Sequence, residues 1–276
     1  MNNVMYFSLY CKDKDNVEYY SMLYYALETL EQFQPLSFDV VVFYSMPGVN
    51  FKQYKHLKKQ KIQKRFPWVK FVKSKYYDTD IHLHKWFNLP YVFDLGYTKV
   101  FYLDCDIVFL KDPNSIFSKY NETGIYQLVE GGNTPVSKIL GKPGAASGQW
   151  VINKKTFDKT FNLYNFILKN KQELIEKSKV VLDRKTAIWF CTVVEQYAAQ
   201  VTLNKQNIIT RNFEIEDVNW HEIFTYTNGE IKYSDKCKIA HYLGCNAHLT
   251  LPEDLLTDNL KQKKMKVENE FNILSK

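Results

Sequence analysis

The sequence has few of the features that would place it outside the class of ordinary globular proteins. Its five cysteines are odd in number and form no CxxC pair, so neither a zinc site nor a disulfide framework is indicated. No apolar run approaches the roughly 18 residues that cross a bilayer. The first residues lead straight into a strand-like stretch, without the pattern of a signal peptide. We therefore expect a soluble, cytoplasmic protein with reduced thiols and no transmembrane segment.

The composition is that of a folded protein. Hydrophobic residues make up 45% of the 276 residues and charged residues 24%, which is enough apolar material for a core and excludes a disordered chain. The formal net charge of +7 favours anionic partners such as phosphates, but the charge is too diffuse to select one. We found no internal repeat and no linker, and we expect one domain.

The first hundred residues alternate between strand and helix patterns. Short runs of apolar, β-branched or aromatic residues at 4–10, 38–44 and 68–72 predict strands. Between them, residues 19–33 and 51–66 carry apolar positions three and four apart and end before or at a proline, which predicts helices. This alternation is typical of an α/β fold with a mainly parallel central sheet flanked by helices, the Rossmann-like arrangement that binds nucleotides.

The rest of the chain shows a less regular pattern. A helix is expected at 84–95, followed by the most apolar strand of the chain at 99–110. The segment 131–148 contains five glycines and two prolines, which indicates a mobile loop beside a cleft. Further elements are expected as strands at 150–153 and 238–243, and as helices at 157–169, 186–200 and 255–271.

Two acids, Asp104 and Asp106, interrupt the apolar strand expected at 99–110. Residues two apart in a strand point to the same side, so the two carboxylates should converge while Cys105 faces away. Two anions this close repel each other, and a hard divalent cation such as Mg²⁺ or Mn²⁺ removes that repulsion. The alternative is a strand end with solvated acids, but the apolar sequence resumes directly after Asp106.

The DxD pattern leaves other chemistries open. Haloacid-dehalogenase-like phosphatases also carry DxD after an apolar strand, the first acid acting as a nucleophile on phosphorus. In those enzymes the motif usually opens the chain, whereas here it follows three predicted strands. A nucleic-acid-binding module is a second alternative, because residues 52–65 are densely basic. The simpler interpretation of that segment is a helix with a solvated lysine face, and we do not expect nucleic acid as a partner.

Several segments in order resemble the retaining glycosyltransferases of family eight, the glycogenin and lipopolysaccharide galactosyltransferase type, which have the GT-A fold. The strongest is YTKVFYLDCDIVFLKDPNSIF at 97–117. The others are HLHKW at 82–86, ASGQWVIN at 146–153, the pair Glu195-Gln196, and IAHYLGCNAH at 239–248. Together they cover most of the chain from residue 6 to residue 248.

The resemblance implies a metal-dependent glycosyltransferase formed by a single domain at 1–276. We divide it into a nucleotide-binding half at 1–110, an acceptor and sugar half at 111–250 and a helical tail at 251–276. Such an enzyme moves a hexose or pentose from a nucleoside-diphosphate sugar, with a UDP-sugar favoured, to a glycan or protein hydroxyl with retention. It implies Mn²⁺ or Mg²⁺ held by Asp104, Asp106 and His241, with Asp104 also contacting the ribose. Glu195 and Gln196 would stabilise developing positive charge, and the glycine-rich loop would close over the donor. The expected contacts to the nucleotide are Ser8, Leu9, Tyr10, Lys85, Gly244 and His248.

The sequence also departs from the family pattern. Ala247 stands where the motif has lysine, the following Pro-Trp is missing, and Ala146 replaces the asparagine of the N-S-G segment. Neutralisation of the phosphates would then fall to His248 or Lys85. The sugar, the acceptor and the oligomeric state stay open, with a homodimer among the possibilities. A self-glucosylating scaffold is a third alternative, although none of the 20 tyrosines stands in a recognisable acceptor context.

Overall fold

The computed structural model describes most of both ends of the chain and part of its middle. The described residues are 2–11, 17–45, 62–74, 84–129, 145–160, 200, 203, 207–219, 224–227, 230–233, 237–242 and 247–274. The basic segment 52–61, most of the glycine-rich segment, Glu195, Gln196 and Gly244 lie outside them.

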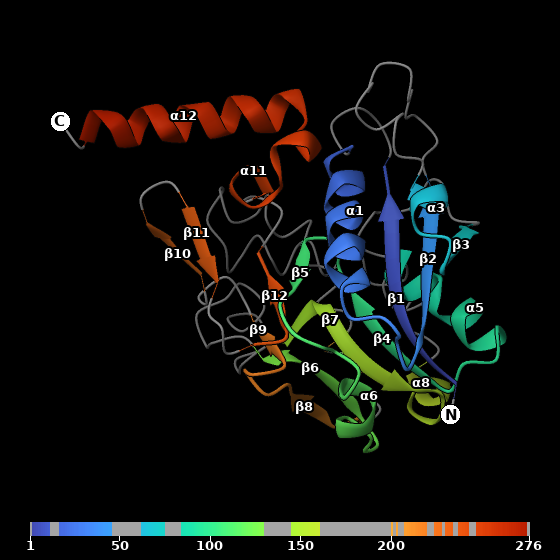
Figure 1. Cartoon of the computed structure of the whole chain (residues 1–276). Helices are drawn as coiled ribbons and strands as arrows, with labels where there is room; N and C mark the ends of the chain where they lie inside the picture. The colour runs from blue at the N-terminus through green and yellow to red at the C-terminus, as the bar shows by residue number, and fades with distance from the viewer. Residues whose placement is uncertain are drawn as a thin grey trace, which may run out of the picture. The chain divides into compact units, whose positions relative to one another are not determined.

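The largest sheet has seven strands in the order β3-β2-β1-β4-β7-β6-β8 (Figure 1). The neighbours β2 and β3 are parallel, as are β6 and β8, whereas β7 is antiparallel to both β4 and β6. The predicted α/β class with a mixed, mostly parallel central sheet flanked by helices is confirmed. The strands are β1 (Asn3–Tyr10), β2 (Asp39–Ser45), β3 (Val69–Lys73), β4 (Lys99–Leu103), β6 (Ile125–Val129), β7 (Ala145–Asn153) and β8 (Thr210–Asn212).

The single strand predicted at 99–110 is wrong. Strand β4 ends at Leu103, and the chain resumes as β5 (Ile107–Phe109), which belongs to a separate three-stranded sheet in the order β5-β12-β9. The acids interrupt the apolar run because they occupy the connection between two sheets. The other strands are β9 (Val218–Asn219), β12 (Ile239–His241) and the hairpin of β10 (Phe224–Thr227) with β11 (Glu230–Tyr233).

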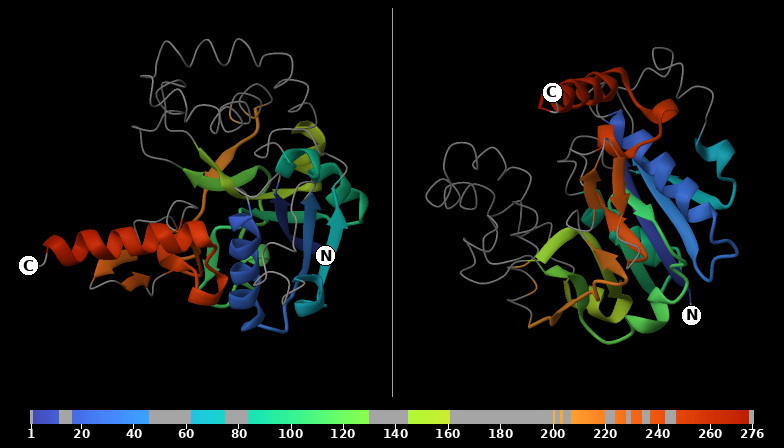
Figure 2. Two further views of the ribbon diagram at one scale, coloured as in Figure 1. Left: turned by 90° about the horizontal axis from the view of Figure 1, so that it is seen from above. Right: turned by 60° about the vertical axis from the view of Figure 1, so that its left-hand side comes forward.

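Helices agree with the predicted pattern at both ends of the chain. Helix α1 (Glu18–Glu31) overlaps most of the helix predicted at 19–33, and α12 (Asp258–Leu274) overlaps most of the helix predicted at 255–271. Figures 1 and 2 show α12 as a single helix leading to the C-terminus. The helix expected at 84–95 is divided at Asn88, just before the proline of the second piece. Within the described residues no helix is long and apolar enough to cross a bilayer. The other helices are α3 (Ile62–Arg65), α4 (His84–Phe87), α5 (Leu89–Asp94), α6 (Ile116–Lys119), α8 (Lys154–Thr160), α11 (Ala247–Thr250) and the 3-10 helix Glu253–Leu255.

The glycine-rich segment is in part a strand. Strand β7 begins at Ala145, which pairs with Val129 of β6, so the last four residues of the predicted loop at 131–148 belong to a strand, and residues 131–144 lie outside the described part.

Chain contacts divide the molecule into two compact units. The first contains Met1–Tyr6, Asp78–Leu103 and Ile116–Phe213. Its core holds a stack of aromatic rings in which Trp150, which is fully buried, lies 4.7 Å from Trp86 and 5.0 Å from Tyr102 between ring centres. The hydroxyl of Tyr6 donates to the carbonyl of Lys85 at 3.1 Å, so this buried polar group is hydrogen-bonded.

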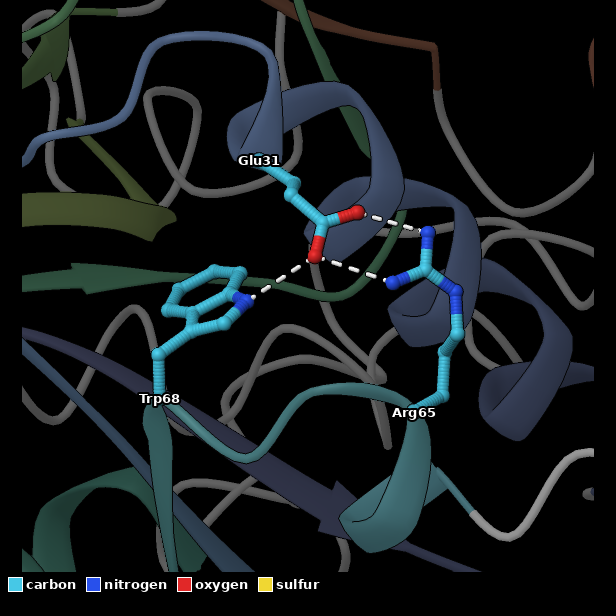
Figure 3. A network of polar contacts seen from close by, with 3 residues as sticks. All are labelled: Glu31, Arg65 and Trp68. Atoms are coloured by element: carbon cyan, nitrogen blue, oxygen red, sulfur yellow. Dashed lines mark hydrogen bonds and ion pairs between the residues drawn. The ribbon is translucent and has the colours of Figure 1, made fainter.

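The second unit contains Phe7–Tyr77, Asp104–Ser115 and Glu214–Lys276. Helix α1 buries one face through Leu23, Leu27 and Leu30, which is the spacing of an amphipathic helix. Its last residue, Glu31, receives two hydrogen bonds from Arg65 at 2.9 and 2.6 Å and one from the Trp68 indole at 3.1 Å (Figure 3). This network ties the end of α1 to the entry of β3.

Candidate functional site

Asp104 and Asp106 lie in the short connection between β4 and β5, within the second unit. Together with His241 they form a cluster whose potential ligand atoms all lie within 4.8 Å of one another. Asp106 and His241 are largely buried and Asp104 is partly exposed. The predicted convergence of the two acids is therefore present. The predicted cause, the pleat of one continuous strand, is wrong because the strand has ended at Leu103.

Strand pairing brings His241 to the two acids. Strand β12 runs antiparallel to β5, with His241 opposite Ile107. The pairing extends one residue further, because the backbone N–H of Tyr242 donates to the carbonyl of Asp106 at 3.1 Å. As a result the Nε2 atom of His241 lies 3.1 Å from Oδ1 of Asp106. A contact between residues this far apart in sequence is decided by sheet register alone.

The three side chains have a geometry that fits a divalent cation. Two ligands at adjacent corners of an octahedron, each about 2.1 Å from the ion, are separated by about 3.0 Å. The 3.1 Å between Nε2 of His241 and Oδ1 of Asp106 matches that separation. Two buried or half-buried carboxylates without a cation repel each other. One imidazole with two carboxylates is a ligand set that suits Mn²⁺ better than Mg²⁺, which prefers oxygen ligands alone.

Cys105 is not part of this ligand set. Its thiol lies 3.7 Å from the carbonyl of Ser8 and is buried. Burial, together with the charges of Asp104 and Asp106, holds the pKa of the Cys105 thiol well above its usual value. The thiol therefore stays protonated, which makes it a poor metal ligand and a poor nucleophile. Its contact with Ser8 places the end of β1 beside the two acids.

Tyr19 is a residue of the site that sequence reasoning missed. Burial raises the pKa of its hydroxyl above the usual value, and the next causes are the charges of Asp106 and Asp104. Tyr19, in the first turn of α1, is therefore near enough to the two acids for their charges to act on its hydroxyl. Nothing in the sequence distinguishes Tyr19 from its neighbour Tyr20, whose hydroxyl instead accepts a bond from the backbone of Ile62. Only the placement of α1 separates the two tyrosines.

The structure places the remaining predicted residues in several environments. Leu9 and Tyr10 are buried at the end of β1. His248 is buried in α11 of the second unit. Lys85 belongs to the first unit, where its side chain is buried and its ammonium lies 5.4 Å from the centre of the Tyr102 ring, at the distance of a cation–π contact. Their roles, and those of Gly244, Glu195 and Gln196 outside the described residues, stay predictions.

Comparison with known proteins locates the fold among glycosyltransferases. No protein-family model and no curated protein matches the sequence, but solved structures do. The galactosyltransferase LgtC, crystallised with donor and acceptor sugar analogues, matches over 95% of both chains with a TM-score of 0.51 and 14% identity. The chain has the GT-A fold.

Two further structures support the GT-A fold. Mouse xyloside xylosyltransferase 1 matches 90% of this chain and 99% of its own, with a TM-score of 0.54 and 11% identity. The glycosyltransferase GlyE of Streptococcus pneumoniae matches 100% of this chain and 65% of its own, with a TM-score of 0.51 and 13% identity. At these identities the likeness establishes the fold, and the activity has to be argued from the site.

Proposed function

We propose that this GT-A protein is a metal-dependent glycosyltransferase that transfers a hexose or pentose from a nucleoside-diphosphate sugar to a hydroxyl acceptor. The observation that carries the proposal is the convergence of Asp104, Asp106 and His241 within 4.8 Å on a fold shared with two sugar transferases. Neither part suffices alone, because the fold hosts more than one chemistry and clustered acids are common on protein surfaces.

The metal-binding side chains would hold a cation beside the negatively charged diphosphate of the donor. Asp104, Asp106 and His241 would hold Mn²⁺ with positions left for phosphate oxygens, and the bound ion would neutralise the leaving diphosphate as a Lewis acid. The burial of Asp106 and His241 keeps water from competing for these positions and strengthens the interaction with the phosphates. The pairing of β5 with β12 fixes the ligands before the donor arrives.

The end of β1 and the start of α1 would bind the nucleoside. Ser8 contacts the turn of the acids through Cys105, so Leu9 and Tyr10 directly follow a residue of the site. The charges of the same two acids act on the hydroxyl of Tyr19. Its partly exposed ring would provide a face on which a planar base can stack. UDP is the nucleotide that we propose, from the resemblance described above.

Retention, and the roles of Glu195 and Gln196 in stabilising positive charge, belong to the same proposal. Lys85 and His248 would neutralise phosphate in place of the motif lysine, which is Ala247 here. The departures leave the sugar and the acceptor undefined.

The decisive experiment measures release of UDP from UDP-glucose, UDP-galactose and UDP-xylose with Mn²⁺, with chelator, and after Mn²⁺ is restored. We expect release only when the ion is present, and none from Asp106→Ala. Full activity of that variant in chelator would overturn the proposal. Release of phosphate from a simple monoester, with no binding of UDP, would select the phosphatase alternative instead.

A further inference from the structure

Strand β5, which directly follows the two acids, pairs with another strand on one edge only. Within the described residues it is an end strand of the sheet β5-β12-β9, and its inner edge pairs with β12. On that edge the N–H of Leu110 donates to the carbonyl of Lys238 at 2.8 Å. Hydrogen-bonded and non-hydrogen-bonded positions alternate along an antiparallel pair. Phe109, next to Leu110, therefore directs its N–H away from β12.

Helix α1 satisfies this N–H with a side chain. The N–H of Phe109 donates to Oγ1 of Thr29 at 3.2 Å in a buried contact. The Thr29 hydroxyl itself donates to the carbonyl of Ala26 at 3.0 Å, which leaves the lone pairs of its oxygen for the strand. Threonine is a poor residue for a helix interior, because its hydroxyl competes for the backbone. An apolar residue here would leave a buried N–H unpaired, so the hydroxyl takes the place of a neighbouring strand.

Apolar packing joins α1 to the same two strands. The buried side chains of Val108 and Ala240 belong to one cluster, and Tyr25 of α1 packs against that cluster. Figure 1 shows α1 alongside β5, and the two elements are in contact. Val108 lies two residues after Asp106, and Ala240 directly precedes His241. Helix α1 thus supports the two strands that position these metal-site residues.

We propose that Thr29 is a positioning residue for the metal site: its hydroxyl holds β5 against α1 and thereby fixes Asp106, which directly precedes β5. This inference rests on the metal site of the proposed function. Strand β5 has only three residues, so few ladder bonds hold it, and the bond to Thr29 secures its outer edge. Metal ligands bind well only when they are held within about 0.5 Å of the required geometry. Thr29 acts on that geometry through the backbone of β5.

The test compares three variants with the parent protein. Thr29→Val keeps the shape of the side chain and removes the hydroxyl, whereas Thr29→Ser keeps the hydroxyl. The matched control is Thr257→Val in the same unit, because the Thr257 hydroxyl is also buried and accepts the N–H of Leu260 at 3.3 Å at the start of α12. Isothermal titration of the metal-free proteins with Mn²⁺ measures Kd, and a thermal melt without metal measures stability.

We expect both valine variants to melt about 2–4 °C below the parent, because each loses one hydrogen bond to a backbone N–H. The Kd for Mn²⁺ should rise about threefold to tenfold in Thr29→Val alone, since loss of a direct partner of a metal ligand costs about 10–100-fold and Thr29 acts less directly. Thr29→Ser should keep the parent Kd. Thr29→Ala, with its higher helix propensity, replaces the valine variant if that variant does not fold.

Three results would overturn the inference. An unchanged Kd in Thr29→Val, at any melting temperature, would show that Thr29 does not position the site, while the proposed function stands. An equal rise of Kd in Thr29→Ser or in Thr257→Val would show that the hydroxyl contact with β5 is not the cause. Failure of the parent protein to bind Mn²⁺ would remove the metal site itself, and this result is distinguishable because it involves no variant.

Discussion

Asp106→Asn should separate metal binding from folding more sharply than any other substitution. The change keeps the size of the side chain but removes its charge, and the backbone bond from Tyr242 to the Asp106 carbonyl does not depend on it. Oδ1 of Asp106 lies at the 3.1 Å separation from His241 Nε2 that adjacent metal ligands have. The variant should therefore fold normally and bind Mn²⁺ poorly.

The expected magnitude follows from ligand linkage. A metal at 100 times its Kd stabilises the folded state by about 2.7 kcal/mol, which for a chain of this size raises Tm by about 5–10 °C. Loss of one of three protein ligands should weaken binding at least about 100-fold, since loss of a mere supporting partner already costs about 10–100-fold. At the same Mn²⁺ concentration the variant would gain only about 0.4 kcal/mol, or roughly 1 °C.

The metal-free proteins provide a second sign. Asp106→Asn removes one of two like charges that lie close together, and the asparagine oxygen can still contact Nε2 of His241, which lies 3.1 Å from Oδ1 of Asp106 in the parent; without metal the variant should therefore be about as stable as the parent. Differential scanning fluorimetry with and without Mn²⁺ measures both quantities. Asp94→Asn, at an exposed position, is the control and should behave as the parent. An equal rise in Tm for Asp106→Asn and parent would refute the metal site.

Three further predictions concern stability and reactivity. Glu31→Gln should lower the free energy of unfolding by about 1 kcal/mol at neutral pH, as a denaturant titration would measure. Because hydrogen bonds from Arg65 lower the pKa of Glu31, this difference should be present above about pH 4.5 and should vanish as the pH falls below the lowered pKa. Gly124→Ala should lower the free energy of unfolding by at least about 1–3 kcal/mol, because φ is +122° and an added Cβ would lie 2.5 Å from the carbonyl oxygen of Ile209. Gly96→Ala should lower it less, because an added Cβ there meets open space. Equal losses of unfolding free energy in chemical denaturation would contradict this reasoning. Cys105 should resist alkylation at pH 8 in the native protein, as mass spectrometry would show, because its thiol is buried with a raised pKa.

Much of the chain could be predicted because its signals are local. The apolar runs of β1 and β2 and the three-and-four spacing of α1 follow from which side chains one element must bury. The break between β4 and β5 could not be predicted, because the sequence 99–110 is equally apolar on both sides of the acids. The sheet that a strand joins is determined by its pairing partners, and the partner of β5 is β12, which is more than a hundred residues away in the sequence.

For the candidate site, the sequence by itself determined the two acids inside an apolar stretch, since charge in an apolar context requires compensation. His241 was predicted from the resemblance of its segment to a family motif, because a single histidine at a strand end does not by itself indicate a ligand. Tertiary structure alone decided that the acids converge through a turn between two sheets, that β12 carries His241 to within 3.1 Å of Asp106, and that the charges of the acids act on Tyr19 whereas Tyr20 accepts a hydrogen bond from Ile62. These outcomes depend on strand register and helix placement, which arise from contacts between distant residues and leave no trace in local sequence.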